Sequence, residues 1–431
     1  MNLRKFLTWS VLWVISFFPV LIWFLYQPTT GKFSDVFSFF GSLAQISGLV
    51  GMAMFSVVLV LSARFVFVEK AFGGLDKLYK AHHILGGLAF SFLLFHPVFS
   101  AIKLAQISFS AALSLFFPSN NNALNFGIFS LLAMIILLVI TFYANFKYNT
   151  WKWTHKFLGL AFLFAIAHTL LIPSDVSRSG FLKYYILTLA VFGVLAYSYR
   201  TLFQRRLVKK YKYTVSEVRL LGDNVFEITM QPKGAAMKFV SGQFIFISFL
   251  DDLLGREAHP FSLVSSPSEG FLKISVKSLG DFTAKLGKLQ AGTEAEIEGP
   301  FGGFSYGKYG HKEQIWIAGG IGITPFLSML SSIGEKSEYK VDLYYCVKNK
   351  GEAVYIPTFE KWKNPNVRII PFYSDESGFI NAGIIEKESS GVLNKDILLC
   401  GPPGMMNALK DQFLDRGVKI KNIHYEEFKL V

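Results

Sequence analysis

Two segments of the chain share one pattern of histidines. The first reads His82-His83-Ile84-Leu85-Gly86 and is followed by His96; the second reads His155-Lys156-Phe157-Leu158-Gly159 and is followed by His168. Each copy places one histidine near the start of an apolar stretch and another 14 or 13 residues later. At about 1.5 Å per residue this separation is roughly 20 Å of helix, which is most of a bilayer core.

Histidine inside a membrane span is costly and is usually kept for function. A single histidine on a helix would more often be a polar residue that makes a helix–helix hydrogen bond. Four histidines in a repeated frame favour a different interpretation, in which two helices supply one histidine pair near each membrane face. This arrangement predicts two bis-histidine hemes stacked across the bilayer. The predicted metal ligands are His82, His96, His155 and His168.

The apolar residues are concentrated in the first half of the chain. Of 431 residues, 52% are hydrophobic and 45 are Phe, which is too apolar on average for a soluble protein. Membrane spans are expected near residues 6–26, 41–63, 82–101, 124–143, 155–172 and 184–203. The first span has a basic start like that of a signal peptide. Its length and the lack of a small-residue cleavage site favour an uncleaved span.

Basic residues near the span ends predict the orientation of the chain in the membrane. With the amino terminus in the cytoplasm, the cytoplasmic segments carry Arg4, Lys5, Arg64, Lys70, Lys77, Lys80, Lys147, Lys152, Lys156, Arg200, Arg205, Arg206, Lys209 and Lys210. The opposite side carries Lys32, Lys103, Arg178 and Lys183. We therefore expect a multi-pass protein of the cell membrane with both termini in the cytoplasm. His82 and His155 would then lie at the inner level, and His96 and His168 at the outer level.

The formal charge of +13 is also typical of proteins that bind nucleic acid. Here the basic residues cluster beside the spans, where attraction to anionic lipid explains them, and no nucleic-acid-binding motif accompanies them. Membrane lipid, and no nucleic acid, is the expected partner. The two cysteines, Cys346 and Cys400, predict neither a disulfide framework nor a cysteine-based metal site.

The sequence pattern changes near residue 210. Short alternating strands separated by Gly, Asp and Pro predict a small antiparallel β-barrel over residues 211–308. Apolar β runs that alternate with helical stretches predict a parallel α/β sheet over residues 309–431. The expected architecture is a six-helix membrane domain over residues 1–210, followed by these two domains.

Two motifs in the barrel region are candidates for ligand binding. His259-Pro260-Phe261-Ser262 lies between two strands, where a planar aromatic ligand could rest and bond to Ser262; a turn with a capping serine is an alternative interpretation. Lys277-Ser278-Leu279-Gly280-Asp281-Phe282-Thr283 is typical of a loop that opens a helix. Free N–H groups, a hydroxyl and a cation at such a place would bind a pyrophosphate. Asp281 could equally be an ordinary N-cap.

Two further motifs end strands of the α/β region. Gly319-Gly320-Ile321-Gly322-Ile323-Thr324-Pro325 follows an apolar strand. Its glycines let a phosphate approach the backbone, and a helix then begins near Pro325. Cys400-Gly401-Pro402-Pro403-Gly404 ends the last strong β run, at the edge where ligands lie in open α/β sheets. By itself Cys400 would more often be a small buried hydrophobe.

These motifs occur in the order seen in ferredoxin–NADP reductase modules: His-Pro-Phe-Ser, Gly-Asp-Phe-Thr, Glu298-Gly-Pro-Phe-Gly302, Gly-Gly-Ile-Gly-Ile-Thr-Pro and Cys-Gly-Pro-Pro. Joined to a six-span domain with four histidines, they resemble the NADPH oxidase and ferric reductase superfamily. The closest resemblance is to a single-chain prokaryotic member, and it covers nearly the whole chain.

The resemblance implies a cofactor for each motif. The four histidines would be axial heme ligands. His259–Ser262, Lys277 and Gly280–Thr283 would bind FAD, and Gly319–Pro325 with Cys400–Pro402 would hold the nicotinamide dinucleotide. Cys400 and Phe428 would be the catalytic residues, because the family commonly has an aromatic residue near its C-terminus over the flavin ring. Three residues follow Phe428 here, a departure from the family, and Phe428 could instead pack in the core of a final strand.

Two further features depart from a simple repeat. His83 stands where the second copy has Lys156, so His83 could replace His82 as the inner ligand, although alignment at Leu85-Gly86 favours His82. Fourteen residues leave an ideal helix about 40° short of four full turns, whereas thirteen leave about 140°. The fifth span must therefore bend, or its two rings must reach toward differently placed irons.

The expected activity is electron transfer across a membrane, from NADPH rather than NADH through FAD and two b-type hemes to an acceptor on the opposite face. With O2 as acceptor the product would be superoxide. A ferric-chelate reductase is the main alternative. Two others are a transporter or channel with a degenerate dinucleotide-binding regulatory domain and a membrane subunit that passes electrons to a partner protein. No obligatory protein partner is evident.

Overall fold

A computed structural model of the chain describes residues 3–26, 31–144, 146, 148–203 and 207–426. These residues form two compact units. The first unit is built from the described residues of the ranges 3–72 and 77–208. The second unit is built from residues 209–426 together with Gly73–Asp76.

The first unit contains six helical spans, among the described residues, that are long and apolar enough to cross a membrane, and this confirms the predicted number. The long helices are α1 (Leu3–Tyr26), α2 (Val36–Ser62), α4 (Leu75–Ala105), α6 (Asn122–Tyr143), α8 (Leu158–Leu171), which continues α7 (Tyr148–Lys156), and α10 (Gly180–Tyr197). The shorter helices are α3 (Val66–Phe72), α5 (Phe109–Ser114), α9 (Asp175–Arg178) and the π-helical η1 (Ser198–Leu202).

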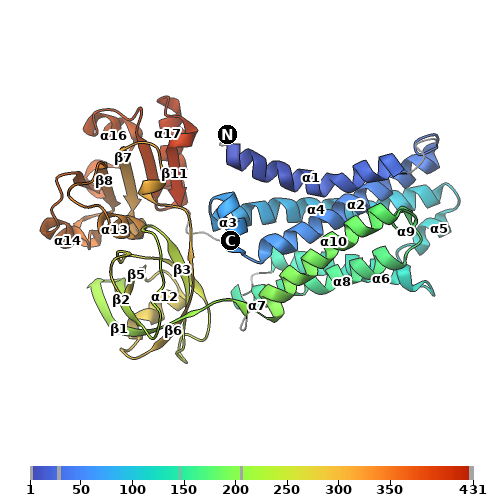
Figure 1. The fold of residues 1–431 in the computed structure, drawn as a ribbon, viewed down its shortest axis with the longest axis horizontal. Coiled ribbons are helices and arrows are strands. Elements are labelled where there is room, and N and C mark those ends of the chain that lie inside the picture. The colour runs from blue at the N-terminus through green and yellow to red at the C-terminus, as the bar shows by residue number, and fades with distance from the viewer. Residues whose placement is uncertain (1–2, 27–30, 145, 147, 204–206, 427–431) are drawn as a thin grey trace. The chain divides into compact units, whose positions relative to one another are not determined.

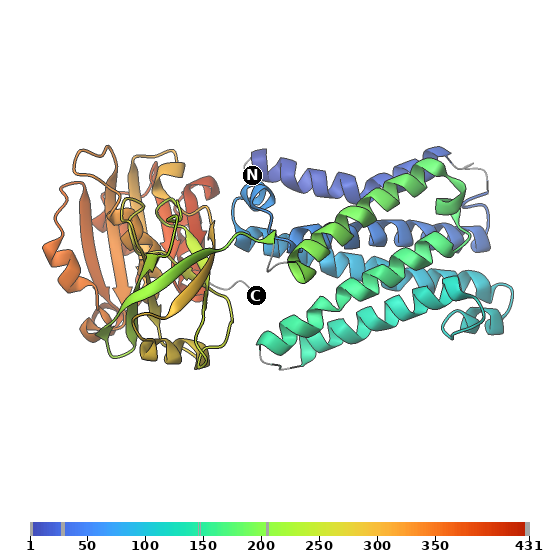
Figure 2. The same ribbon diagram turned by 60° about the horizontal axis from the view of Figure 1, so that its bottom comes forward.

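The long helices run side by side as a bundle, with α2 at its centre (Figure 2). In the most apolar 18-residue stretch of α2, 72% of the residues are buried, whereas the corresponding share in α4 is 11%. The side chains of Asp35, Asn121 and Ser179 cap the first turns of α2, α6 and α10 by accepting hydrogen bonds from backbone N–H groups. These caps fix where the spans begin.

The second unit begins with a six-stranded antiparallel sheet of strand order β4-β3-β6-β1-β2-β5. Its strands are β1 (Tyr211–Gly222), β2 (Val225–Pro232), β3 (Phe244–Phe249), β4 (His259–Ser262), β5 (Leu272–Lys277) and β6 (Glu294–Phe301). A bridge between Leu263 and Ile274 joins the two end strands, so the sheet curls around its apolar core as predicted. The short helices α12 (Asp281–Lys285) and η2 (Leu286–Lys288) follow β5.

A five-stranded parallel sheet of strand order β11-β10-β7-β8-β9 completes the second unit. Its strands are β7 (Glu313–Gly319), β8 (Lys340–Val347), β9 (Val367–Tyr373), β10 (Asp396–Cys400) and β11 (Ile423–Glu426). The connecting helices are η3 (Tyr306–Lys308), η4 (Gly320–Ile323), α13 (Thr324–Leu330), η5 (Lys350–Glu352), α14 (Ile356–Lys361), α15 (Ser374–Ser377), α16 (Ala382–Glu388), α17 (Pro403–Asp415) and η6 (Ile420–Asn422).

Helices cover both faces of this sheet (Figure 1). Alternate side chains of β7 point to opposite faces: Trp316 packs with α13, and Ile315 and Ile317 pack with α16 and α17. The strand order reverses between β7 and β10. Such a reversal opens a crevice at the carboxyl ends of the strands, where ligands bind in this class of fold. The glycine motif after β7 and Cys400 at the end of β10 meet at this place.

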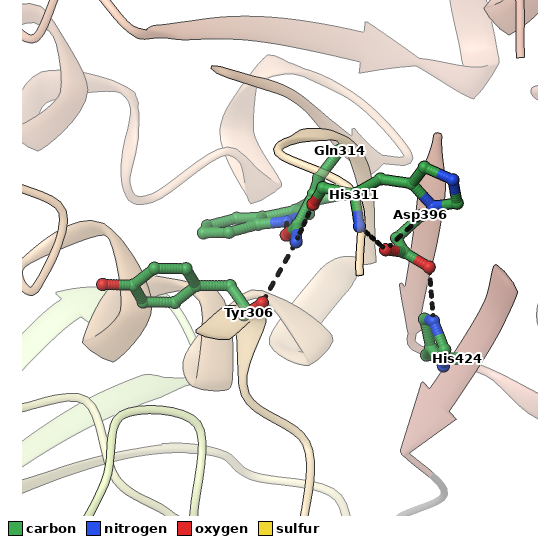
Figure 3. A network of polar contacts seen from close by, with 6 residues as sticks. Tyr306, His311, Gln314, Asp396 and His424 are labelled. Carbon is green, nitrogen blue, oxygen red and sulfur yellow. Dashed lines mark hydrogen bonds and ion pairs between the residues drawn. The ribbon is translucent and has the colours of Figure 1, made fainter. Parts of the chain in front are cut away.

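The amino ends of the same strands are joined by a polar network (Figure 3). Asp396 is 2% exposed and begins β10. Its carboxylate accepts hydrogen bonds from the backbone N–H of His311 at 2.7 Å and from His424 Nε2 at 2.8 Å. The ring of Tyr309 stacks on His424 with centroids 3.5 Å apart. The network therefore ties the loop before β7 to β10 and β11.

We expect Asp396→Asn to destabilise this sheet by about 1.5–3 kcal/mol, because hydrogen bonds to a buried charge are lost. Burial raises the pKa of Asp396, but the bonds from His424 and His311 outweigh it and the net pKa is lowered. A lowered carboxyl pKa stabilises the fold at neutral pH, and this contribution is lost as the pH falls through the folded-state pKa. Thermal unfolding followed by circular dichroism, measured from pH 7 to pH 4, would show a smaller pH dependence in the variant.

The matched control is Asp342→Asn. Asp342 pairs with Arg368 at 2.9 Å, and the Arg368 side chain is 50% exposed. Exposed pairs contribute about 0–1 kcal/mol. Equal melting temperatures and equal pH profiles for the two variants would contradict a stabilising role for the buried carboxylate.

Candidate functional site

The four predicted histidines form two facing pairs in the helical unit. The ring centroids of His82 and His155 are 6.3 Å apart, and those of His96 and His168 are 6.2 Å apart. A metal–imidazole bond is about 2.0–2.1 Å, so two rings that bind one metal ion from opposite sides have centroids roughly 6 Å apart. Both pairs therefore have the separation that a bis-histidine heme requires.

Three of these rings donate a hydrogen bond to a backbone carbonyl through Nδ1. The acceptors are Val58 O for His82 at 3.1 Å, Ala44 O for His96 at 2.7 Å and Ala123 O for His168 at 2.8 Å. A carbonyl can only accept, so Nδ1 carries the proton and Nε2 keeps its lone pair. Metal-binding histidines commonly have this second hydrogen bond, which fixes the tautomer and the ring orientation.

Two glycines let the rings of His96 and His168 approach the neighbouring helices. A Cβ added to Gly48 of α2 would lie 2.9 Å from His96 Nδ1, and one added to Gly127 of α6 would lie 2.8 Å from His168 Nδ1. Any side chain at these positions would push the ring away. The ring separation of both pairs, the tautomer of three rings and the space beside His96 and His168 thus fit hemes held between the paired rings.

The structure also shows which histidines form the other pair and where the fifth span is interrupted. His82 faces His155, whereas His83 is exposed. The fifth span is interrupted at Phe157, between α7 and α8. Tyr197 of α10 donates a hydrogen bond to the carbonyl of Lys156 at 3.0 Å, and its ring occupies the space where Gly159 lacks a side chain. The interruption lies between His155 and His168, where the histidine spacing called for either a bend or differently placed irons.

A cavity of about 210 Å³ lies in the second unit. It brings together the barrel motifs, the glycine motif and the end of β11. Its lining combines aromatic and apolar surfaces with hydroxyls, one cation and one carboxylate. The lining residues are Phe244, Pro260, Phe261, Ser262, Ser275, Val276, Lys277, Leu279, Thr283, Ile321, Thr324 and Glu426.

The predicted flavin motifs contribute unequally to this cavity. Pro260, Phe261 and Ser262 line it directly. His259 instead stacks on Phe282 with ring centroids 3.7 Å apart. Lys277 reaches the cavity but also pairs with Glu352 of the α/β region at 3.1 Å. The predicted cation, Lys277, therefore lines the cavity, but its charge is already paired with the Glu352 carboxylate.

The loop at Gly280 differs from the prediction. Thr283 Oγ1 accepts hydrogen bonds from the backbone N–H groups of Leu279 and Gly280, at 2.9 and 3.0 Å, so these two groups are not free for a phosphate. Gly280 is the N-cap of α12, and Asp281 is its first helical residue. The interpretation of Asp281 as the N-cap is therefore wrong. Thr283 organises the loop and lines the cavity.

Glycines of the motif after β7 make close backbone packing possible. A Cβ on Gly322 would lie 2.2 Å from the carbonyl oxygen of Cys400, and one on Gly319 would lie 2.7 Å from Pro402. A Cβ on Gly401 would meet the Gly319 backbone at 2.9 Å. Gly320 has a φ of +55° and open space around it. The ends of β7 and β10 thus pack closely against each other. Two further residues of this motif, Ile321 and Thr324, line the cavity. Ile323 and Pro325 are buried.

Cys400 is fully buried, and Glu426 lies beside it on the neighbouring strand β11. Burial and, secondarily, the Glu426 carboxylate raise the pKa of the Cys400 thiol well above its ordinary value, so the thiol is neutral. Burial also raises the pKa of Cys346, to about 12. Glu426 and Phe244, which the sequence interpretation missed, both line the cavity. Phe428 lies outside the described residues.

Comparison with known families divides the chain in the same way. Residues 47–166 match a ferric reductase-like transmembrane component. Residues 210–313 match an FAD-binding domain, and residues 316–411 match an oxidoreductase NAD-binding domain. The helices that carry the histidines and the cavity with its motifs therefore lie in regions with recognised relatives.

Individual relatives match parts of the chain. NADPH oxidase 1 of Mus musculus is 34% identical over 130 residues, which cover 29% of this chain and 22% of the mouse protein. The phenol hydroxylase P5 protein of Acinetobacter pittii is 26% identical over 242 residues, covering 52% of this chain and 67% of that protein. A ferredoxin NADP+ reductase structure from Neisseria gonorrhoeae is 19% identical and covers 51% of this chain and 98% of that one, with a TM-score of 0.44.

The three matched domains stand in one chain, in this order, with six apolar helices ahead of the two nucleotide-binding domains. The chain is therefore an oxidoreductase in which a segment that matches a ferric reductase-like transmembrane component is followed by an FAD-binding domain and an NAD-binding domain.

Proposed function

We propose that this chain moves electrons from cytoplasmic NADPH through FAD and two b-type hemes to O2 on the opposite membrane face, giving superoxide. The proposal rests on the two histidine pairs, which lie in helices able to span a membrane. The ring centroids are 6.3 Å apart in one pair and 6.2 Å apart in the other. When bound, the flavin would accept a hydride, and the flavin and hemes would pass single electrons.

The helical residues would hold the hemes and set their orientation. His82 and His155 would bind the inner heme, and His96 and His168 the outer one. The carbonyls of Ala44, Val58 and Ala123 fix three of the four rings. The spacing of 13 residues separates His155 and His168 along the span, and the interruption at Phe157 would let both rings turn toward their partners. Rigid ligands of this kind reduce the structural change that accompanies each electron transfer.

The cavity residues would position the two nucleotides. Phe261 and Phe244 would contact the flavin ring, with Ser262 donating a hydrogen bond to its edge, and Lys277 and Thr283 would face phosphates. The crevice at Gly319–Pro325 and Cys400–Pro402 would hold the nicotinamide dinucleotide. The neutral, buried Cys400 would pack near the reacting ring without acting as a thiolate. Phe428 would shield the flavin until the nicotinamide displaces it.

The orientation is part of the proposal. Fourteen basic residues against four favour a cytoplasmic location for both termini and for the nucleotide-binding domains. The protein would then lie in the cell membrane and reduce its acceptor outside the cytoplasm. Attraction of the basic segments to anionic lipid would stabilise this orientation.

Purification tests the electron-transfer proposal directly. We expect a red protein with a low-spin b-type spectrum, two hemes and one FAD per chain, and heme reduction by NADPH without O2. A colourless protein with no bound heme would contradict the proposal and favour a transporter or channel with a regulatory nucleotide domain. A heme protein inactive toward small acceptors would favour a subunit that serves a partner protein.

A ferric-chelate reductase is the second candidate, because residues 47–166 match a ferric reductase-like component. The two activities differ only in the acceptor. Superoxide formation and ferric-chelate reduction should be measured in the same membrane preparation with NADPH. The chain would be a ferric-chelate reductase if it forms little superoxide and if ferric reduction persists when O2 is absent and when superoxide is removed.

We expect the double variant Lys348→Gln, Lys350→Gln to reduce the preference for NADPH over NADH by about 10-fold or more, because one charge-assisted bond to the 2′-phosphate is lost. Both side chains are exposed after β8, and Lys350 pairs with Glu376 at 3.3 Å. The measurement is the ratio of KM values for the two cofactors. Lys340→Gln, at the other end of β8, is the control. An unchanged ratio of the two KM values in the double variant would show that these lysines do not bind the 2′-phosphate.

A further inference from the structure

One of the four histidines differs from the others in its hydrogen-bond partner. Nδ1 of His155 lies 3.3 Å from the side-chain hydroxyl of Thr141, whereas the other three rings donate to backbone carbonyls at 2.7–3.1 Å. His155 is therefore the only member of this set of four whose hydrogen-bond partner is a side chain.

The helices that face the histidines carry the same spacing of four positions. In α2 these positions are Ala44, Gly48, Val58 and Ser62; in α6 they are Ala123, Gly127, Leu137 and Thr141. The first two positions play the same part in both helices, because a carbonyl accepts from the outer histidine and a glycine makes room for its ring. This repeat predicts that the Leu137 carbonyl accepts from His155, as the Val58 carbonyl accepts from His82.

The hydroxyl at the fourth position changes the outcome. Ser62 Oγ donates to the carbonyl of Leu59 at 2.7 Å, which leaves the Val58 carbonyl to His82. Thr141 Oγ1 donates instead to the carbonyl of Leu137 at 2.7 Å. A hydroxyl has one proton to donate and two lone pairs to accept. The Thr141 oxygen therefore accepts from His155 Nδ1–H, in a chain that runs from the ring through the hydroxyl to Leu137.

We propose that Thr141 is a positioning residue for His155 and sets the electron donation of this one ligand, so that the inner heme differs chemically from the outer heme. The inference rests on the proposed heme function. A hydrogen bond from Nδ1–H makes the imidazole a stronger donor to iron and favours the oxidised metal. A hydroxyl at 3.3 Å is a weaker acceptor than the carbonyl that Ala123 offers to His168 at 2.8 Å.

Packing holds the His155 ring in place independently of this bond. Trp151 stacks against it with centroids 5.4 Å apart and planes 21° apart. Replacement of the hydroxyl by a methyl group would therefore leave the ring in position but leave its Nδ1–H without an acceptor. The expected change is electronic, and heme content should be retained.

Thr141→Val in the full-length, heme-loaded protein tests the inference. The measurements are the midpoint potentials of both hemes by spectroelectrochemistry and their low-spin g values by electron paramagnetic resonance. We expect a positive shift of one potential and altered g values for one heme, with the other heme unchanged. Thr141→Ser, which keeps the hydroxyl, should restore both values.

Ser62→Ala is the matched control, because it removes the hydroxyl at the corresponding position of α2 without touching a histidine bond. It should leave both potentials unchanged. Loss of one heme in Thr141→Val but not in Thr141→Ser or Ser62→Ala would overturn the electronic role, because the hydroxyl would then be needed to hold the ligand in place. Two hemes with unchanged potentials and g values in Thr141→Val would overturn it. A wild-type protein without heme would contradict the proposed function instead, so the two failures are distinguishable.

Discussion

A His168→Ala variant is expected to retain one of its two hemes and to lose electron delivery to the acceptor. His96 would remain with no facing ring at 6.2 Å, and the Ala123 carbonyl would lose its donor. A single imidazole and an empty porphyrin cavity hold heme poorly, and a lower yield of folded protein is expected as well. Heme per chain, measured by the pyridine hemochrome method, should fall by half, while FAD content stays constant.

His83→Ala is the control for this experiment. His83 is exposed next to His82, so its replacement should leave both hemes in place. His82→Ala should remove the inner heme. If His82→Ala keeps its full heme content and His83→Ala does not, the assignment of the inner ligand is wrong. Retention of both hemes in His168→Ala would contradict the outer pair.

Gly322→Ala is expected to destabilise the α/β region by about 1–3 kcal/mol or more, because the new Cβ would lie 2.2 Å from the Cys400 carbonyl oxygen. Backbone atoms on both sides must shift to accommodate the methyl group. The measurements are the temperature of flavin release, the Kd for NADPH and the heme spectrum. We expect the first to fall and the second to rise, with the heme spectrum unchanged.

Gly404→Ala is the matched control. Gly404 lies in the first turn of α17 with no atom within 4 Å of an added Cβ, so alanine should leave the melting temperature unchanged or slightly higher. An unchanged melting temperature in Gly322→Ala with weakened NADPH binding would mean that this glycine makes room for a ligand phosphate. A lowered melting temperature would assign it to the packing of β7 against β10.

The fold class could be predicted from the sequence because its signals are local. Long apolar runs identify spans, and short alternating runs identify strands, wherever these segments lie in space. The same holds for the histidine frame, because 14 or 13 residues of helix cover most of a bilayer whatever the neighbouring helices do. The three matched domains confirm this architecture.

The contributions of individual residues could not be predicted in the same way. Glu426 reaches the cavity because β11 pairs in register with β10, and a strand pairing is not visible in either strand alone. The packing of Gly322 could not be predicted either, because the atom that an added Cβ would meet belongs to the backbone of Cys400, about 80 residues later in the chain. Thr283 takes up two N–H groups that were expected to be free.

By itself the sequence determined which segments cross the membrane, which carry paired histidines and which form the nucleotide-binding domains, because periodicity and composition act along the chain. Only the tertiary structure decided how the histidines are held. The ring of Tyr197 packs against Gly159, and its hydroxyl donates a hydrogen bond to the Lys156 carbonyl. The hydroxyl of Thr141, and not a backbone carbonyl, is the hydrogen-bond partner of His155. The physical reason is that hydrogen bonds and close contacts depend on side chains of different helices, whose relative rotation no single helix specifies.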